Sequence, residues 1–259
     1  MSDFSTNAIL LRKIEFGDHD LIISFFTKSN GKISVIAKNA KKSINRFSGS
    51  FDIFCENHIQ CSFPKKKKDG MTILAKSDLE KGFANIRCDI FKTAYASFWI
   101  ELLYFYLEEN KAQLDLYDLL LFALDALNNN TISKEVLNLL FQIKFMSMAG
   151  FSPNLENCDK CQTLIDDFDQ KNVSFDFKEG QIVCQKCLRT KLKHGMTVSK
   201  GTLKQLFWIN NTDITKADRI KFSSYAIKEG AILLEAFIPF HIGRDFKSLK
   251  FLRKIRDKS

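Results

Sequence analysis

The sequence predicts a β + α protein with three parts: a small five-stranded barrel, a helical domain, and a cysteine-bearing module inserted into the helices. Two observations carry this prediction. Short apolar runs separated by turns give way near residue 80 to apolar residues spaced three and four apart, and two Cys-x-x-Cys pairs then interrupt the helical pattern. We expect domain boundaries at 1–80 for the barrel, 81–152 with 191–259 for the helices, and 153–190 for the inserted module.

The first part contains five strand-like runs rich in Ile, Leu, Val and Phe, and Asn30-Gly31 between the second and third favours a tight antiparallel hairpin. Pro64 ends the fourth run, and the lysines at 65–68 form the next turn. Five short strands in about 75 residues are typical of the OB-fold, the commonest small five-stranded barrel. The predicted strands cover residues 8–14, 21–27, 32–37, 51–63 and 71–76.

The helical part shows one apolar face over 91–105 and nearly continuous apolar character over 114–127 and 136–148, as expected of helices buried in a bundle. Gly150 and Pro153 end the third helix. Beyond the cysteines we expect helices at 199–209 and 215–237, capped by Ser199 and Asp213, and a basic helix over 246–256.

The cysteines predict a structural zinc site. Cys158 and Cys161 form one pair and Cys184 and Cys187 a second, with 22 residues between the pairs. Two such pairs supply four thiolates to one tetrahedral ion and leave no open position for water, so we expect one structural zinc and no catalysis there. Two disulfides fit poorly with a chain that shows no export signal, and an iron–sulfur centre remains an alternative on ligands alone.

The other cysteines, Cys55, Cys61 and Cys88, have no ligand spacing, and the alternation of Cys55 and Cys61 with apolar residues favours packing on one strand. A deaminase-type zinc enzyme would need a His-x-Glu motif, which none of the four histidines provides. The sequence also lacks a phosphate-binding loop and a Gly-x-Ser-x-Gly elbow, so we predict no enzymatic activity.

The net charge of +9 is concentrated at the two ends of the chain. Residues 1–80 carry +4 and residues 191–259 carry +9, whereas the middle is acidic. A basic loop in the barrel, with Lys38, Lys41, Lys42 and Arg46, is a candidate phosphate contact beside an OB-fold face. A second basic region, which suits DNA or an acidic peptide tail, contains Arg244, Lys247, Lys250 and Arg253. Solvated lysines on a soluble protein are the plainer interpretation of both patches.

The most apolar stretches are shorter than a membrane span and carry acidic residues, and the N-terminus shows no secretory leader. We therefore expect a cytoplasmic protein with no membrane partner.

Across essentially its full length the chain resembles the RecO family of bacterial DNA repair and recombination mediators. The blocks that carry the resemblance are Ala8–Arg12, Gly17–Ile22, Phe26-Thr27, Gly31, Ala37–Lys42 with Arg46, Glu101-Leu102, Ala149–Pro153, Phe240–Arg244 and Lys247–Leu252. The resemblance implies an OB-fold, a helical domain and a zinc module. It also implies binding of single- and double-stranded DNA, annealing of complementary strands, partnership with RecR and with the C-terminal tail of the single-stranded-DNA-binding protein (SSB), and assistance to RecA loading.

Three positions depart from the family pattern: Asn39 and Gln162 stand where the family usually has Gly, and Glu179 replaces the first Gly of a Gly-Gly pair. Asn tolerates left-handed backbone, so we expect the loop at Asn39 to survive. Two rival functions remain at this point, a zinc-ribbon transcription or RNA-binding factor and a protein-interaction scaffold whose basic patches bind only acidic partners.

Overall fold

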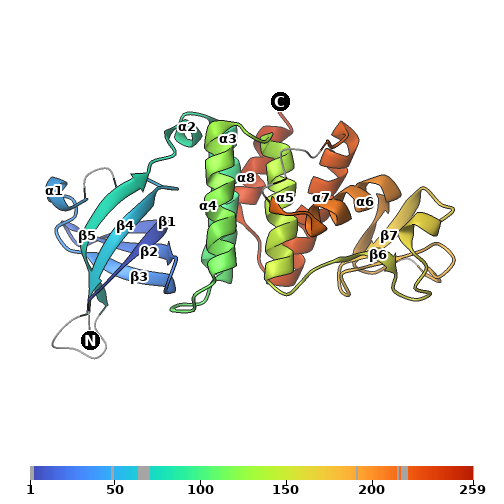
Figure 1. The fold of residues 1–259 in the computed structure, drawn as a ribbon, viewed down its shortest axis with the longest axis horizontal. Helices are drawn as coiled ribbons and strands as arrows, with labels where there is room; N and C mark the ends of the chain where they lie inside the picture. The colour runs from blue at the N-terminus through green and yellow to red at the C-terminus, as the bar shows by residue number, and fades with distance from the viewer. Residues whose placement is uncertain are drawn as a thin grey trace. The chain divides into compact units, whose positions relative to one another are not determined.

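A computed structural model describes residues 3–47, 50–63, 71–190, 192–214, 216 and 221–258 (Figure 1). The chain forms two compact units, one of Met1–Asn129 with Lys247–Ser259 and the other of Asn130–Phe246. The first unit combines the barrel with helices, and the second combines helices with the cysteine module. The three-part division made from the sequence stays a prediction about domains, because compactness divides the chain differently.

The barrel of the first unit is closed, in the strand order β1-β2-β3-β5-β4. Neighbouring strands are antiparallel except β3 and β5, which are parallel. This confirms the predicted five-stranded OB-fold barrel. The strands are β1 (Phe4–Phe16), β2 (Asp20–Thr27), β3 (Gly31–Ala37), β4 (Glu56–Ser62) and β5 (Thr72–Lys81), and the short helix α1 (Ile44–Phe47) lies between β3 and β4. The core of the barrel is filled by buried apolar side chains, among them Ala8, Leu10, Ile23, Phe25, Val35, Ile59 and Leu74.

The predicted strand over 51–63 was wrong at its start. Residues 51–55 form turns, with Phe54 at a φ of 75°, and β4 begins only at Glu56. Cys55 therefore precedes the strand that contains Cys61, although both thiols are buried as expected. The strands β1 and β5 are longer than predicted, and Pro64 and the lysines at 65–68 lie outside the described residues.

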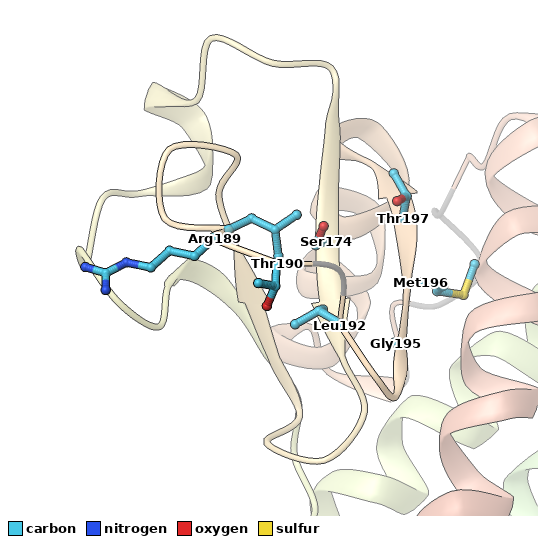
Figure 2. Close-up of a pocket in the computed structure, with 8 residues that line it drawn as sticks. Ser174, Arg189, Thr190, Leu192, Gly195, Met196 and Thr197 are labelled. Carbon is cyan, nitrogen blue, oxygen red and sulfur yellow. The ribbon is translucent and has the colours of Figure 1, made fainter.

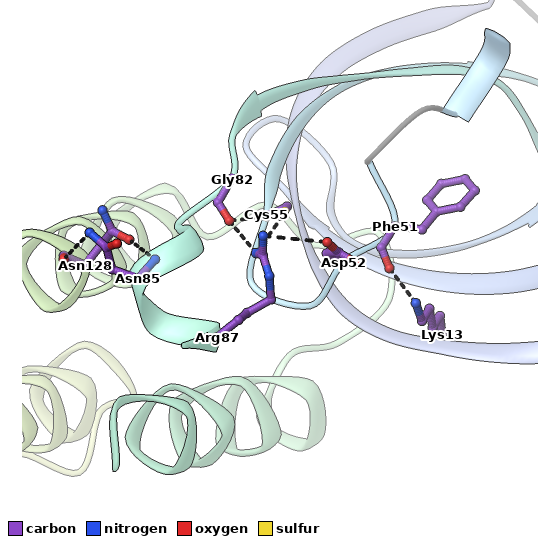
Figure 3. Close-up of polar contacts among 8 residues, drawn as sticks. All are labelled: Lys13, Phe51, Asp52, Cys55, Gly82, Asn85, Arg87 and Asn128. Atoms are coloured by element: carbon purple, nitrogen blue, oxygen red, sulfur yellow. Dashed lines mark hydrogen bonds and ion pairs between the residues drawn. The ribbon is translucent and has the colours of Figure 1, made fainter. Parts of the chain in front are cut away.

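The turn before β4 is held by polar contacts (Figure 3). Arg87 lies 3.6 Å from an oxygen of Asp52, donates to the carbonyl of Gly82, and has a guanidinium nitrogen 3.5 Å from Cys55 Sγ. Lys13 of β1 donates to the Phe51 carbonyl at 2.7 Å. Burial raises the pKa of the Cys55 thiol, so this cysteine is a packed neutral group.

Three helices of the first unit directly follow the barrel in sequence, and a fourth follows the second unit. They are α2 (Ala84–Arg87), α3 (Ile90–Tyr106), α4 (Leu114–Asn129) and α8 (Lys247–Arg256). Glu101 of α3 accepts hydrogen bonds from the first turn of α8, at the backbone N–H groups of Lys247 (3.2 Å) and Ser248 (2.8 Å) and at the Ser248 hydroxyl. A carboxylate at a helix N-terminus satisfies free N–H groups and the helix dipole, so Glu101 fixes where α8 begins.

The second unit contains α5 (Lys134–Met148), α6 (Lys200–Asn211) and α7 (Ser224–Ile242). Ser199 caps α6 as expected, but the helix predicted from 215 begins later, because Ser223 rather than Asp213 accepts the hydrogen bond from its first turn. Residues 215 and 217–220 lie outside the described residues. Within the part of the chain that the structure describes, we found no helix long and apolar enough to cross a membrane.

A small four-stranded sheet completes the second unit, in the order β6-β8-β7-β9. Its strands are β6 (Asn154–Cys158), β7 (Asn172–Asp176), β8 (Gln181–Val183) and β9 (Gly195–Ser199), with the 3-10 turn η1 (Ile165–Asp167) between β6 and β7. β7 and β8 form the expected antiparallel hairpin, with Gly180 at a φ of 65° in its turn. β9 extends this sheet beyond residue 190.

Candidate metal centre and nucleic-acid interface

The four paired cysteines lie together. Cys158 is the last residue of β6 and Cys161 follows in the next turn, while Cys184 and Cys187 occupy the turn after β8. Their sulfur atoms all lie within 4.8 Å of one another, which is an arrangement that could hold a metal ion. The parallel pairing of β6 with β8 brings the two turns side by side. Sequence spacing therefore identified the whole cluster.

The sulfur geometry fits a tetrahedral site. Cys161 Sγ and Cys184 Sγ are 3.8 Å apart, and four sulfurs at the usual zinc–sulfur distance of about 2.3 Å would be separated by about 3.8 Å. The backbone N–H of Cys184 donates to Cys158 Sγ at 3.4 Å, a contact that stabilises negative charge on sulfur. Four thiolate donors close the coordination shell.

Each pair sits on a hydrogen-bonded turn. In the first turn, Gln162 N–H donates to the Cys158 carbonyl and Cys158 N–H to the Thr163 carbonyl, both at 2.9 Å. Gln162 has a φ of 61°, which lies in the left-handed region that favours glycine. The first Cys-x-x-Cys turn is therefore closed by a residue that is less suited than glycine to this backbone conformation.

The sulfurs differ in their protonation chemistry. A hydrogen bond between Cys161 Sγ and the Thr163 hydroxyl at 3.2 Å lowers the pKa of the Cys161 thiol to about 6. Hydrogen bonds with the neighbouring thiols of Cys161 and Cys184 raise the pKa of Cys187 to about 12. Since a metal ion binds thiolates, its binding to this cluster depends on pH.

A cavity of about 340 Å³ lies elsewhere on this module, against β7 and β9 (Figure 2). Hydroxyl and apolar side chains line it, including Ser174, Leu192 and Thr197, and Arg189 points away from the hollow in the figure. Among the described residues that line it, Arg189 is the only charged one, so they form no cluster of charges suited to a polyanion.

The basic loop follows β3, and its four candidate side chains differ in what they contact. Lys38 and Lys42 are exposed, and neither has a carboxylate partner among the described residues. Lys41 forms an ion pair with Glu15 at 2.9 Å. Arg46 donates to the Lys38 carbonyl at 2.6 Å and to Ser43 at 2.9 Å, so its guanidinium holds the loop together.

Asn39 shapes this loop. It has a φ of 54°, so the expectation that Asn tolerates the left-handed position is confirmed. Its N–H donates to Asp20 Oδ1 at 2.7 Å, and its carbonyl accepts from the N–H groups of Lys42 and Ser43 at 3.1 Å. These bonds tie the loop to the start of β2 and present Lys38 and Lys42 to solvent.

The second basic region is divided between the two units. Lys247, Lys250 and Arg253 lie on α8 in the first unit and are exposed. Arg244 is exposed as well, but it belongs to the second unit. Only the three residues on α8 are therefore brought together within one compact unit.

A third group of cations was missed by the sequence analysis. Arg12 of β1 and Lys32 of β3 both lie over the ring of Tyr104 on α3, with their charged groups 5.4 and 5.3 Å from its centroid. Arg12 also donates to the Tyr104 hydroxyl at 3.0 Å, and Lys32 to the Tyr104 carbonyl at 3.0 Å. No sequence motif links residues so far apart, and only strand register would have suggested that Arg12 and Lys32 share a face.

Two family models together match most of the chain. Residues 1–83 match "Recombination protein O N terminal" and residues 87–250 match "Recombination protein O C terminal". A DNA repair protein RecO of Desulfatibacillum aliphaticivorans is 42% identical over 256 residues, covering 99% of this chain and 98% of the relative. Those of Desulfosudis oleivorans and Syntrophus aciditrophicus are 35% and 29% identical, covering 99% and 97% of this chain and 99% and 95% of the relatives.

Proposed function

The chain belongs to the RecO family of DNA repair proteins, and from this premise we propose that it is a non-enzymatic mediator of DNA repair and homologous recombination. In this proposal it binds single- and double-stranded DNA and anneals complementary strands. Annealing requires only that two polyanions are held together while their repulsion is screened, so bound cations suffice and no catalytic group is needed.

The observation that carries the proposal is the exposure of Lys38 and Lys42, without carboxylate partners among the described residues, beside an OB-fold barrel. OB-folds bind oligonucleotides on their strands and adjoining loops, and lysines in such a loop contact phosphates. Lys41 and Arg46 contribute charge to the same loop while they hold its shape.

We further propose that Cys158, Cys161, Cys184 and Cys187 hold one zinc ion. The ion would keep the two turns of the module in place and supply structure rather than chemistry, because four sulfur ligands leave no position for substrate. Zinc is preferred over an iron–sulfur cluster because the tight sulfur spacing suits a single ion.

The protein partners are proposed from the family. RecR and the C-terminal tail of SSB would bind this chain, which would thereby assist RecA in the cytoplasm, near the nucleoid. The exposed cations of α8, Lys247, Lys250 and Arg253, suit either DNA or the acidic SSB tail. Arg244, which belongs to the second unit, is a further candidate cation for the same partners.

A strand-annealing assay with and without SSB tests the proposal. The wild type should speed annealing of complementary oligonucleotides, and the double variant Lys38→Ala/Lys42→Ala should do so more slowly with an unchanged melting temperature. Lys76→Ala is the matched control, because Lys76 is paired with Asp78 at 2.8 Å on the same barrel.

The rival functions give other results. A zinc-ribbon transcription or RNA-binding factor would prefer one duplex or RNA sequence in competition. A scaffold that binds only acidic proteins would show no annealing. Binding to oligonucleotides that is insensitive to salt would contradict the phosphate contacts.

A further inference from the structure

Four isoleucines form a row across the barrel. Strand register aligns Ile14 of β1 with Ile22 of β2, Ile22 with Ile36 of β3, and Ile36 with Ile73 of β5. Ile14 is 43% exposed and the other three are half-buried. Since paired residues of neighbouring strands point to the same side of a sheet, these side chains make one apolar strip.

The strip lies on the outside of the barrel. The residues that alternate with it, Ile23, Val35 and Leu74, fill the barrel core. A β-bulge between Leu10 and Arg12 turns the second half of β1 over, so that Arg12, Ile14 and Phe16 face outward although Leu10 faces inward. An aligned apolar strip that is partly exposed on the outside of a sheet indicates a binding surface.

At one end of this outer face lies an exposed aromatic ring. Phe16 is 52% exposed and follows Ile14 on the same side of β1. It is aligned with Asp20, whose carboxylate accepts the hydrogen bond from Asn39 in the basic loop. Phe16 is therefore adjacent to the loop that presents Lys38 and Lys42.

At the other end lies the pair of cations over Tyr104. Arg12 is aligned with Ser24 and Ser34 in the row next to the isoleucines. Arg12 and Lys32 have no carboxylate partner within the described residues, while Glu109 at this end accepts from the Ser34 hydroxyl at 3.2 Å. Two cations and one acid leave this end positive.

The chemistry of the face favours one occupant. It needs a ligand with flat apolar groups for the strip and the ring, and negative charge for cations at both ends. A single-stranded nucleic acid has both, since its bases are unstacked and free to contact side chains. A duplex hides the faces of its bases within the helix.

We propose that a single strand of nucleic acid crosses the outer face of β1, β2 and β3, with a base stacked on Phe16 and phosphates bound by Arg12 and Lys32 at one end and by Lys38 and Lys42 at the other. This inference rests on the proposed function and adds to it the path of the strand and the residue that stacks.

The test compares two probes: an oligothymidylate of about 20 nucleotides, long enough to span one OB-fold, and an abasic strand of the same length. Because stacking on one aromatic ring strengthens binding about 5- to 150-fold, Phe16→Ala should raise the Kd for oligothymidylate by that factor. It should change the Kd for the abasic strand by less than about twofold. Phe16→Tyr should restore binding, and Tyr225→Ala, which removes an exposed aromatic residue of the second unit, should have no effect.

Three results would overturn the inference. Equal weakening on both probes would mean that Phe16 supports the fold rather than a base. Wild-type binding that Phe16→Ala leaves unchanged would place the strand elsewhere while the proposed function stands. A third probe is an extended peptide of alternating Asp and Leu residues. If Phe16→Ala weakened binding of this peptide and of neither strand, the face would be a protein-docking surface. A wild type that binds neither strand would instead contradict the proposed function itself.

Discussion

Removal of the proposed zinc ion should destabilise the second unit and spare the first. The four sulfurs lie in two turns, 158–161 and 184–187, that the metal would join. In its absence the turns would be linked by hydrogen bonds such as those from Cys184 N–H to Cys158 Sγ and from Asp159 N–H to the Ile182 carbonyl. One of the turns also holds Gln162 in a left-handed conformation that disfavours non-glycine residues. The ion should therefore contribute directly to the stability of the second unit.

The expected fall in unfolding temperature follows from the linkage between metal binding and folding. With free zinc at 1,000 times its Kd, binding stabilises the folded state by about 4.1 kcal/mol. The second unit spans residues 130–246, about 117 residues, and its unfolding entropy is then about 0.25 kcal/mol per kelvin. Chelation should lower the unfolding temperature of this unit by about 16 °C.

Tryptophan fluorescence separates the two units. Trp99 is buried in the first unit and Trp208 lies in the second, so a Trp208→Phe variant reports on the first unit alone. The transition that is seen in the wild type but absent from Trp208→Phe belongs to the second unit. Chelation and Cys187→Ser should each lower its unfolding temperature. Cys88→Ser, which changes an exposed cysteine outside the cluster, is the control.

The reasoning is refuted if zinc-loaded and chelated protein unfold at the same temperature, or if both units shift equally. It is also refuted if Cys187→Ser still binds one equivalent of zinc with unchanged affinity, since the fourth sulfur would then contribute nothing.

Three further outcomes follow from the first unit. Gly31→Ala should destabilise it by at least about 2 kcal/mol in urea unfolding, because Gly31 has a φ of 68° and a Cβ there would overlap the Lys111 carbonyl. Glu101→Ala should lower stability by about 1–2 kcal/mol, since the N–H groups and hydroxyl at the start of α8 lose their acceptor, and a thermal melt should fall by about 3–6 °C. Lys42→Ala should reduce the slope of log K against log salt for single-stranded DNA by about 0.7, the share of one phosphate contact, measured by titration across salt concentrations.

Each of these has a matched control. Gly201→Ala lies on a helix where a Cβ meets nothing within 4 Å, so it should not destabilise the protein. Glu101→Gln should lose less stability than Glu101→Ala, because its amide oxygen still accepts hydrogen bonds. If Glu101→Gln were as unstable as Glu101→Ala, the stabilisation would come from the charge alone. For Lys42, an unchanged salt slope would remove this lysine from the phosphate contacts.

Local rules predicted the cysteine module and the outline of the barrel. Cys-x-x-Cys spacing places two sulfurs on one turn, and Asn30-Gly31 closes a hairpin, whatever the remainder of the chain does. Local rules failed to predict the start of β4 and the N-terminal cap of α7, because the hydrophobic pattern does not show which contacts compete there. Apolar residues at 51–54 favoured a strand but form turns, and Ser223 replaced Asp213 as the cap of α7.

The sequence by itself determined the fold class and the four clustered cysteines, because hydrophobic period and ligand spacing are properties of neighbouring residues. Membership of a DNA repair family followed from similarity over nearly the whole chain. Only the tertiary structure decided which side chains share a surface. Glu15 pairs with Lys41, Glu101 caps a helix that begins 146 residues later, and Arg12 meets Tyr104 across 92 residues. One β-bulge decided that Ile14 and Phe16 face outward, since by simple alternation with Leu10 both would point into the barrel core.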